Sequence, residues 1–426
     1  MIAVNVHHDS NKIILDTMRI RSDKSTIVLM WLIFQLLPLM TNAGCSAMWA
    51  CQVRMPRESI LYDRKLNNRR VASELLLNHA GVYRKNGLDV LQRDSLVKLN
   101  LFYALAERVV RYRVSFSADA TAQFCSSLGD FRVYVDVPHQ RMSLATNPVM
   151  AIQVPFLQGG RDYLIEIYHI YQKAKVCITD MRTKKRVELS TVNDGTGGCG
   201  AGALQQGFSV GMQWDYYCFG LVSGTSFSVK RITVGALKRH VKVLLYGDSI
   251  TQPEGYYPTS TFPESWTQLI IERLKGDAMS SGRGGGNIVM LSEFIRNELP
   301  YIKAKYVVVT IGTNGGNTEE NLTELIRYIR SQGAIPILNN IPCNESGTHI
   351  SNNAIIERVR SKEGVNGCRF DLATSLAGDG KEVDKSLMFW EDYTGSYGWQ
   401  IYHHPNEKGS LRMYRQTFVD IPEIYQ

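Results

Sequence analysis

The sequence predicts two folded regions of different class: an all-β sandwich or jelly roll over 60–238, and a three-layer α/β/α domain with a parallel sheet over 239–426. Two patterns carry this prediction. Short alternating apolar segments fill the first region, whereas apolar strand-like runs alternate with amphipathic helical stretches in the second. The length of 426 residues, with 44% hydrophobic and 21% charged residues, is typical of a folded chain of two or three domains.

Residues 1–50 are predicted to be an export signal with an upstream leader. The apolar run at 26–40, TIVLMWLIFQLLPLM, follows three basic residues within 19–24 and precedes small residues at 42–44. A membrane span needs about 20 apolar residues, so we expect no transmembrane helix in the mature protein and a secreted or periplasmic location. Met18 lies directly before the basic residues, which suggests that translation starts there.

The cysteines fit an exported chain, because disulfides persist in oxidising compartments. The sequence NAGC, ending at Cys45, resembles a bacterial lipoprotein box that lacks its usual leucine, so a lipid anchor at Cys45 and a cell-surface location stay open. There is no C-x-x-C pair, and no metal site is predicted. One sequence does not determine which cysteines form disulfides with one another, and buried free thiols are an alternative to disulfides. The six cysteines after the signal region are Cys125, Cys177, Cys199, Cys218, Cys343 and Cys368.

The net charge of +8 does not indicate a nucleic-acid partner. Lysine and arginine are scattered along the chain, with only short clusters such as 184–186, and no nucleic-acid-binding motif occurs. We therefore interpret the lysine and arginine residues as ordinary solvent-exposed surface residues.

Four segments of the first region alternate apolar and polar residues and are rich in Val, Ile, Tyr and Phe, as strands are. Turn residues at 159–160 and 193–198 separate some of them. The segments are DFRVYVDV at 130–137, DYLIEIYHI at 162–170, KVCITDM at 175–181 and TSFSVKRITV at 225–234.

Strands and helices alternate in the second region, which favours a parallel sheet covered on both faces. Strands are predicted at 241–246, near 277–279, and at 306–311, 335–339 and 368–372. Helices are predicted around 266–274, from Thr318 to Gly333, and from Pro405 or Asn406 through Val419.

Ligands of such sheets gather beyond the carboxyl ends of the strands, and four polar segments are predicted to lie there. They are Gly247-Asp248-Ser249, the glycine cluster at 281–286, Gly312-Thr313-Asn314, and His403-His404-Pro405-Asn406. Each alone has an ordinary interpretation as a turn, a flexible loop or a helix cap. Their order and shared placement indicate a catalytic site.

Together the segments GDSIT, SGRGGG, GTN and HPNEKG resemble the four blocks of the SGNH hydrolases, also called the GDSL esterase family, in family order. The α/β-hydrolase elbow is excluded, because Gly-x-Ser-x-Gly would need glycine at Thr251. The resemblance covers the α/β region.

The resemblance implies a role for four residues and no cofactor. Ser249 resembles the family nucleophile, whose backbone N–H also faces the oxyanion, and His404 resembles the general base. Gly282 lends a second backbone N–H and Asn314 a side-chain amide. The physical requirements agree, since a serine hydroxyl needs a neighbouring base and the tetrahedral intermediate needs fixed donors.

One departure from the family is clear. The usual aspartate three residues before the histidine is replaced by Ile401, and the corresponding position for His403 is Gln400. A backbone carbonyl, Glu391 or Asp392 must then orient the imidazole; otherwise catalysis is weakened or lost.

The leading prediction is a secreted esterase that acts on acetylated carbohydrate or another small ester, by analogy with secreted carbohydrate esterases that carry a β-sandwich. A glycan-binding protein with a degenerate hydrolase domain is one alternative; its basis is Ile401 together with Trp214, Tyr216 and Tyr217, which otherwise pack in the sandwich. A lipid or thioester hydrolase of the same family is another.

Overall fold

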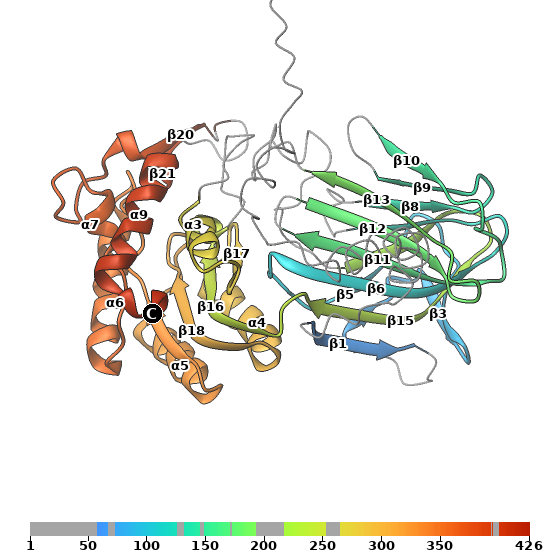
Figure 1. Ribbon diagram of the computed structural model, residues 1–426, viewed down its shortest axis with the longest axis horizontal. Coiled ribbons are helices and arrows are strands. Elements are labelled where there is room, and N and C mark those ends of the chain that lie inside the picture. The colour runs from blue at the N-terminus through green and yellow to red at the C-terminus, as the bar shows by residue number, and fades with distance from the viewer. Residues whose placement is uncertain are drawn as a thin grey trace, which may run out of the picture. The chain divides into compact units, whose positions relative to one another are not determined.

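The computed structural model describes residues 58–66, 73–125, 132–144, 149–170, 173–192, 217–252, 265–392, 394 and 400–426 (Figure 1). The predicted export signal, Cys45, the turn at 193–198, Cys199, Trp214 and Tyr216 lie outside these residues. The chain divides into compact units after Pro56, and Arg57–Gln426 forms one of them.

The first part of the described chain consists of two antiparallel sheets, which hold most of its strands (Figure 1). The eight-stranded sheet has the order β13 (Arg186–Val192), β12 (Lys173–Asp180), β11 (Asp162–Ile170), β6 (Glu107–Phe116), β15 (Phe227–Ala236), β4 (Gly87–Val90) and β3 (Gly81–Arg84), with β1 (Ser59–Lys65) also paired to β15. The seven-stranded sheet has the order β10 (Met150–Gln153), β9 (Arg141–Leu144), β8 (Arg132–Asp136), β7 (Thr121–Cys125), β14 (Tyr217–Ser223), β5 (Leu96–Leu99) and β2 (Leu75–Leu76).

Aromatic side chains join the two sheets. The ring of Tyr112 on β6 lies 4.8 Å from Phe124 on β7 and 5.7 Å from Phe219 on β14, measured between centroids. Alternate residues point to opposite faces of a strand, so each sheet supplies one apolar face to this core. All four segments predicted as strands in this region are strands. Tyr217, considered as a sugar-stacking residue, is buried and contacts Tyr103.

The second part contains a four-stranded parallel sheet in the order β17 (Ala278–Arg283), β16 (His240–Asp248), β18 (Lys303–Thr310) and β19 (Ile335–Leu338). On β16, Leu244 and Tyr246 belong to one buried cluster, whereas Val243 and Leu245 belong to another. The helices therefore divide between the two faces: α4 (Ile288–Glu298), α5 (Glu319–Ser331) and α6 (Thr348–Glu363) share the first cluster, and α3 (Trp266–Arg273) and α9 (Glu407–Asp420) share the second.

Side-chain caps explain where the predicted helices begin. Thr318 and Asn321 form a reciprocal capping box at the start of α5. Asn406 Oδ1 accepts from the backbone N–H groups of Lys408 and Gly409 at the start of α9. The predictions of these helices are confirmed.

The strand predicted at 368–372 is wrong. Asn340 N donates to Cys368 O, as beside a sheet edge, but Cys368 N donates to the side chain of Asn339 instead of a backbone carbonyl. The ladder therefore stops, and the chain turns into the short helix α7 (Phe370–Thr374). Local apolar character did not distinguish a buried strand from a buried helical turn.

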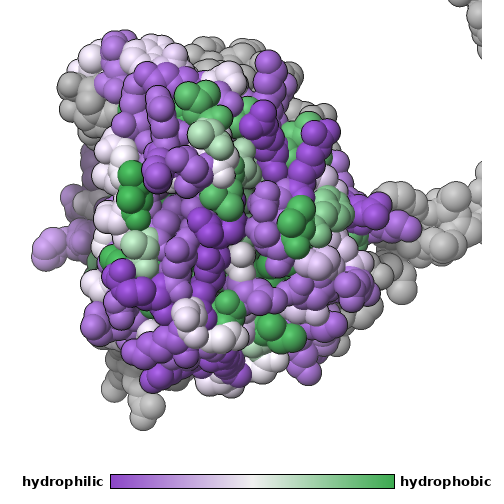
Figure 2. All heavy atoms as spheres, turned by 90° about the vertical axis from the view of Figure 1, so that its left-hand side faces the viewer, coloured by the Kyte–Doolittle hydropathy of each residue, from purple (hydrophilic) through white to green (hydrophobic). Residues whose placement is uncertain are grey.

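Cys177, Cys343 and Cys368 are free, buried thiols, whereas Cys125 and Cys218 lie opposite each other on β7 and β14. Among the described residues, no helix is both long and apolar enough to cross a membrane. The face that carries α6 and α9 is mostly hydrophilic with scattered apolar spots (Figure 2). Scattered apolar residues are ordinary on a protein surface.

Candidate active site

Ser249 lies where the parallel sheet ends. Strand β16 stops at Asp248, and Ser249 opens a 3₁₀ turn, η1 (Ser249–Thr251). Asp248 caps this turn, because its Oδ1 accepts from Ile250 N at 3.0 Å. The indole of Trp266 donates to Ile250 O at 2.7 Å and ties the turn to α3. Two hydrogen bonds therefore hold the short turn that carries the serine, and a nucleophile requires such a fixed position.

Gly282 lies on the neighbouring strand β17, in register with Gly247. A Cβ atom on Gly282 would lie 2.4 Å from the carbonyl carbon of Thr251 and 2.5 Å from Gln252 N. Only glycine allows the two backbones to approach so closely. The predicted oxyanion glycine is thus in contact with the turn that carries Ser249.

Asn314 follows the third strand of the same edge. Thr310, the last residue of β18, pairs with Gly247. The Asn314 amide donates to Gly286 O at 2.9 Å, and the ideal Cβ position of Gly286 lies 3.7 Å from Asp248 Cα. The structure therefore brings the second and third sequence blocks together beside the end of β16.

His404 reaches Ser249 from the hairpin formed by β20 (Met388–Asp392) and β21 (Gln400–Pro405). His404 Nε2 lies 2.7 Å from Ser249 Oγ, and both side chains are buried. The two residues are separated by 155 positions in the chain, so the parallel sheet and the hairpin together make this contact.

Glu391 supplies the carboxylate that the position of Ile401 lacks. The antiparallel register places Glu391 on β20 directly opposite Ile401 on β21. Its Oε1 lies 2.7 Å from His404 Nδ1, and its Oε2 accepts from His404 N at 3.3 Å. Asp392 points elsewhere and accepts from Thr394 and Gln400. The hydrogen bond expected from a carboxylate of this segment is confirmed, and the residue is Glu391.

Burial governs the charge of these groups. Burial lowers the pKa of His404 to about 4, with the neighbouring His403 acting in the same direction and Glu391 opposing it. Burial alone would raise the pKa of Glu391, but His404 and His403 lower it to about 2. At neutral pH, His404 is therefore an uncharged imidazole. The Nδ1–H of this imidazole donates to an ionised Glu391, and its Nε2 is free to accept from Ser249.

His403 is a second imidazole beside the same carboxylate. Its Nδ1 lies 2.7 Å from Glu391 Oε2, at ion-pair distance. The rings of His403 and His404 are 3.8 Å apart between centroids. The sequence showed the adjacent histidines, but gave no sign that both would face one carboxylate.

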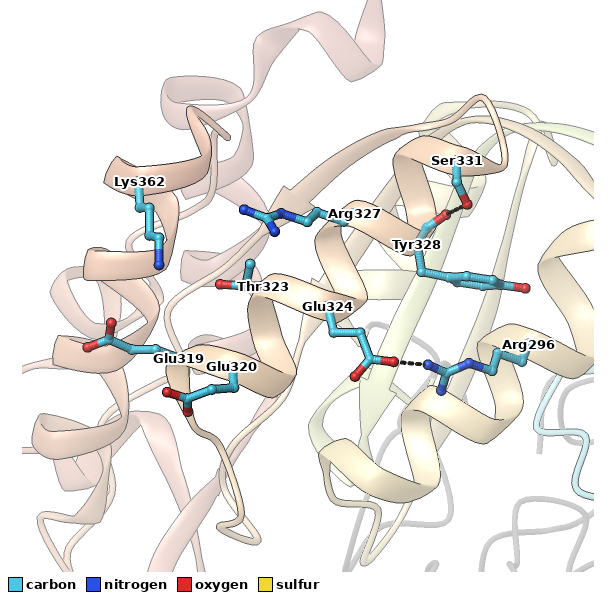
Figure 3. A pocket seen from close by; sticks show the side chains of 9 residues that line it. All are labelled: Arg296, Glu319, Glu320, Thr323, Glu324, Arg327, Tyr328, Ser331 and Lys362. Carbon is cyan, nitrogen blue, oxygen red and sulfur yellow. Dashed lines mark hydrogen bonds and ion pairs between the residues drawn. The ribbon is translucent and has the colours of Figure 1, made fainter.

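A groove of about 630 Å³ lies elsewhere, on the outer surface of α4, α5 and α6 (Figure 3). Several of its charged side chains form ion pairs within the protein: Arg296 with Glu324, and Arg327 with Glu363. It contains none of the four predicted site residues. Its lining consists of Arg296, Glu319, Glu320, Thr323, Glu324, Arg327, Tyr328, Ser331 and Lys362.

Comparison with known proteins adds only distant structural likeness. No family model matches the chain, and no curated protein matches it. Solved structures that resemble part of it include an acylhydrolase-like protein from Bacteroides fragilis (15% identity, 44% of this chain and 89% of that chain, TM-score 0.34). An acetyl xylan esterase variant from Geobacillus stearothermophilus matches at 15% identity over 43% of this chain and 94% of its own, with a TM-score of 0.33.

A GDSL-like lipase from Bacteroides thetaiotaomicron matches at 15% identity over 42% of this chain and 85% of its own, with a TM-score of 0.32. The lectin-like defence protein arcelin-5 from Phaseolus vulgaris matches at 12% identity over 43% of this chain and all of its own, with a TM-score of 0.31. Esterases and lipases thus occur among the structural neighbours. At these TM-scores the likeness assigns no function to this chain.

Proposed function

We propose that this protein is a serine esterase that hydrolyses carboxylic esters. The observation that carries the proposal is the continuous chain from Ser249 Oγ through His404 to Glu391, with both links at 2.7 Å. A nucleophile, a base within hydrogen-bond reach and a third group that orients the base are the arrangement that nucleophilic acyl transfer requires.

In the proposed mechanism, His404 Nε2 takes the proton from Ser249 Oγ as the oxygen attacks the ester carbonyl. Glu391 holds the Nδ1–H tautomer and stabilises the imidazolium that forms. The tetrahedral intermediate collapses when His404 returns the proton to the leaving alkoxide. Water then attacks the acyl-enzyme with His404 again as the base, which releases the acid and restores Ser249.

The oxyanion is proposed to be bound by the backbone N–H groups of Ser249 and Gly282 and by the side-chain amide of Asn314. The close approach of Gly282 to the η1 turn supports this assignment. Asn314 uses one of its two amide N–H groups on Gly286 O, and the other remains for the oxyanion. Each such donor is worth about 2.7–4 kcal/mol in other acyl transferases.

The proposed substrate is an acetylated carbohydrate met outside the cytoplasm. The support is the export-signal pattern of residues 1–50 and the large all-β region that precedes the site in the chain. N-terminal sequencing of the naturally produced protein tests the location: we expect the chain to start after residue 43, and an intact Met1 on a cytoplasmic product would refute it.

The activity is tested with p-nitrophenyl acetate and the Ser249→Ala variant. We expect turnover by the wild type, none above background by the variant, and a nearly unchanged Tm, because the substitution removes only one oxygen atom. Wild-type turnover by purified Ser249→Ala would exclude Ser249 as the nucleophile. Release of acetate from acetylated oligosaccharides, set against hydrolysis of long-chain esters, separates a carbohydrate esterase from a lipid hydrolase. Glycan binding without any turnover would favour the binding protein instead.

A further inference from the structure

Two imidazoles and one carboxylate converge behind the proposed nucleophile. Glu391, His403 and His404 each offer a ligand atom, and these atoms all lie within 4.8 Å of one another. The Nδ1 atoms of His403 and His404 are each 2.7 Å from a different oxygen of Glu391. The ordinary role of Glu391 uses only one of these contacts, which leaves the convergence of all three groups to be explained.

We propose that Glu391, His403 and His404 form an inhibitory site for Zn²⁺ or a similar transition-metal ion. Two imidazole nitrogens and a glutamate oxygen are a ligand set that zinc accepts, with a fourth position left for water. Zinc bonds these atoms at about 2.0–2.2 Å, which sets tetrahedral ligands roughly 3.4 Å apart. The two 2.7 Å contacts therefore need to widen by about 0.7 Å, and the third pair of ligand atoms, which lies within 4.8 Å, needs to close by at most about 1.4 Å.

The surroundings of the three residues suit such an ion. The Glu391 carboxylate is fully buried against both imidazoles, and buried carboxylates are usually paired with a cationic group or coordinate a metal. His403 is the most exposed of the three, with 13% of its side chain accessible against 0% for Glu391 and 3% for His404. His403 therefore gives the side from which an ion reaches the carboxylate. Calcium and magnesium prefer oxygen ligands and are not expected to compete.

Inhibition follows from the tautomer of His404. In the active state the proton is on Nδ1, and Nε2 accepts from Ser249. A metal ion bound at Nδ1 takes the lone pair of that nitrogen, and the proton moves to Nε2, so the imidazole stays neutral and the proton count does not change. Nε2–H is a donor and cannot take the serine proton. The metal thus removes the general base without entering the substrate's position.

This inference rests on the proposed function only for its effect on turnover, and metal binding itself is measured independently. Calorimetric titration of the EDTA-treated protein with ZnCl₂ should show one strong site. Ser249→Ala should bind zinc as the wild type does, because Ser249 is not a ligand. Zinc should lower the kcat of the wild type for p-nitrophenyl acetate with little change in KM, and EDTA should restore it.

His403→Gln is the variant that decides. Loss of one direct ligand should raise the zinc concentration for half-inhibition at least about tenfold, since even residues behind the ligands contribute about 10- to 100-fold to metal affinity. Each variant is compared with its own zinc-free rate. His139→Gln is the matched control, because His139 is an exposed histidine in the turn between β8 and β9, and its Nδ1 lies 2.8 Å from Asp136. It should leave zinc inhibition unchanged.

A second measurement needs no substitution. NMR of the wild type loaded with Co²⁺ should show two exchangeable imidazole N–H signals with large paramagnetic shifts, one from each histidine bound through Nδ1. The proposal is overturned if zinc binds neither the wild type nor Ser249→Ala, or if His403→Gln is inhibited as strongly as the wild type. Zinc binding without any esterase turnover would support the site and refute the proposed function.

Discussion

The sharpest prediction concerns Glu391→Gln. The substitution keeps the shape of the side chain but replaces an anion with an amide that has one acceptor and one donor end. In the wild type, both oxygens of Glu391 accept: Oε1 from His404 Nδ1 at 2.7 Å and Oε2 from His404 N at 3.3 Å. His403 Nδ1 also lies beside Oε2. Glutamine satisfies only one of these two sides.

The magnitude depends on which way the amide turns. If its oxygen faces Nδ1, the tautomer survives, and the loss is that of a hydrogen bond to a charged group, about 1.5–3 kcal/mol, or about 10- to 150-fold in rate. If its NH₂ faces Nδ1, the proton is forced onto Nε2, and the loss approaches the roughly 10⁴-fold found for a serine protease. In the first orientation, the glutamine NH₂ group faces the backbone N–H of His404, so that two hydrogen-bond donors oppose each other. We therefore expect the second to dominate and kcat to fall by about 10³- to 10⁴-fold.

The assay is steady-state hydrolysis of p-nitrophenyl acetate, with kcat and KM measured separately. KM should change little, because Glu391 acts on the base and not on the substrate. Asp392→Asn is the matched control, since Asp392 is the adjacent carboxylate and is exposed; its kcat should stay within about twofold, as for ordinary surface substitutions. A Glu391→Gln enzyme with kcat within fivefold of the wild type would refute the orienting role.

The remaining predictions concern Asn314, Gly282, His404 and Glu298. Asn314→Ala should lower kcat by about 10²- to 10³-fold and leave KM nearly unchanged, as expected for a donor to charge that develops in the transition state; a pure KM effect in the same assay would make Asn314 a substrate-binding residue. Gly282→Ala should lower the free energy of unfolding by about 1–3 kcal/mol and reduce turnover, because its Cβ would overlap Thr251; a wild-type Tm and rate would contradict this. As the pH is lowered below 6, kcat/KM should stay constant and should fall only as the pH approaches the pKa of His404, about 4; a midpoint of this fall near pH 6.5 would mean that the base is not buried. Burial raises the pKa of Glu298 from 4.5 to about 7, so the folded state binds one proton more than the unfolded state between these values, and stability falls as pH rises through this window. At about 1.4 kcal/mol per pKa unit, the unfolding free energy of Glu298→Gln relative to the wild type should rise by about 3 kcal/mol between pH 4 and pH 8, whatever the variant loses opposite Ala104 N and Ser281 Oγ, which both donate to Glu298; an unchanged difference at the two pH values would refute the burial argument.

Much of the fold was predictable because it depends on local patterns. The alternation of Asp162–Ile170 and the apolar run ending at Asp248 have the periods of strands, and Thr318 and Asn406 are good helix caps. The segment 368–372 shows the limit of this reasoning. Whether it continues the sheet depends on which acceptor Cys368 N finds, and that acceptor is the side chain of Asn339.

The sequence by itself determined the four site residues as candidates. Ser249 and Asn314 each follow a strand of the parallel sheet, Gly282 lies near the end of β17, and His404 lies in β21 just before α9. Parallel strands bring their carboxyl ends to one edge, so the placement of Ser249, Gly282 and Asn314 needed only the order of the strands.

Only the tertiary structure decided which group orients His404. The hairpin register sets Glu391 opposite Ile401, and alternate residues of a strand face opposite sides, so Glu391 points inward while Asp392 points outward. A shift of one residue in this register would exchange the two. Neither the register nor the pairing of both histidines with one carboxylate is a local property, because each depends on where β20 packs against a strand about a dozen residues away.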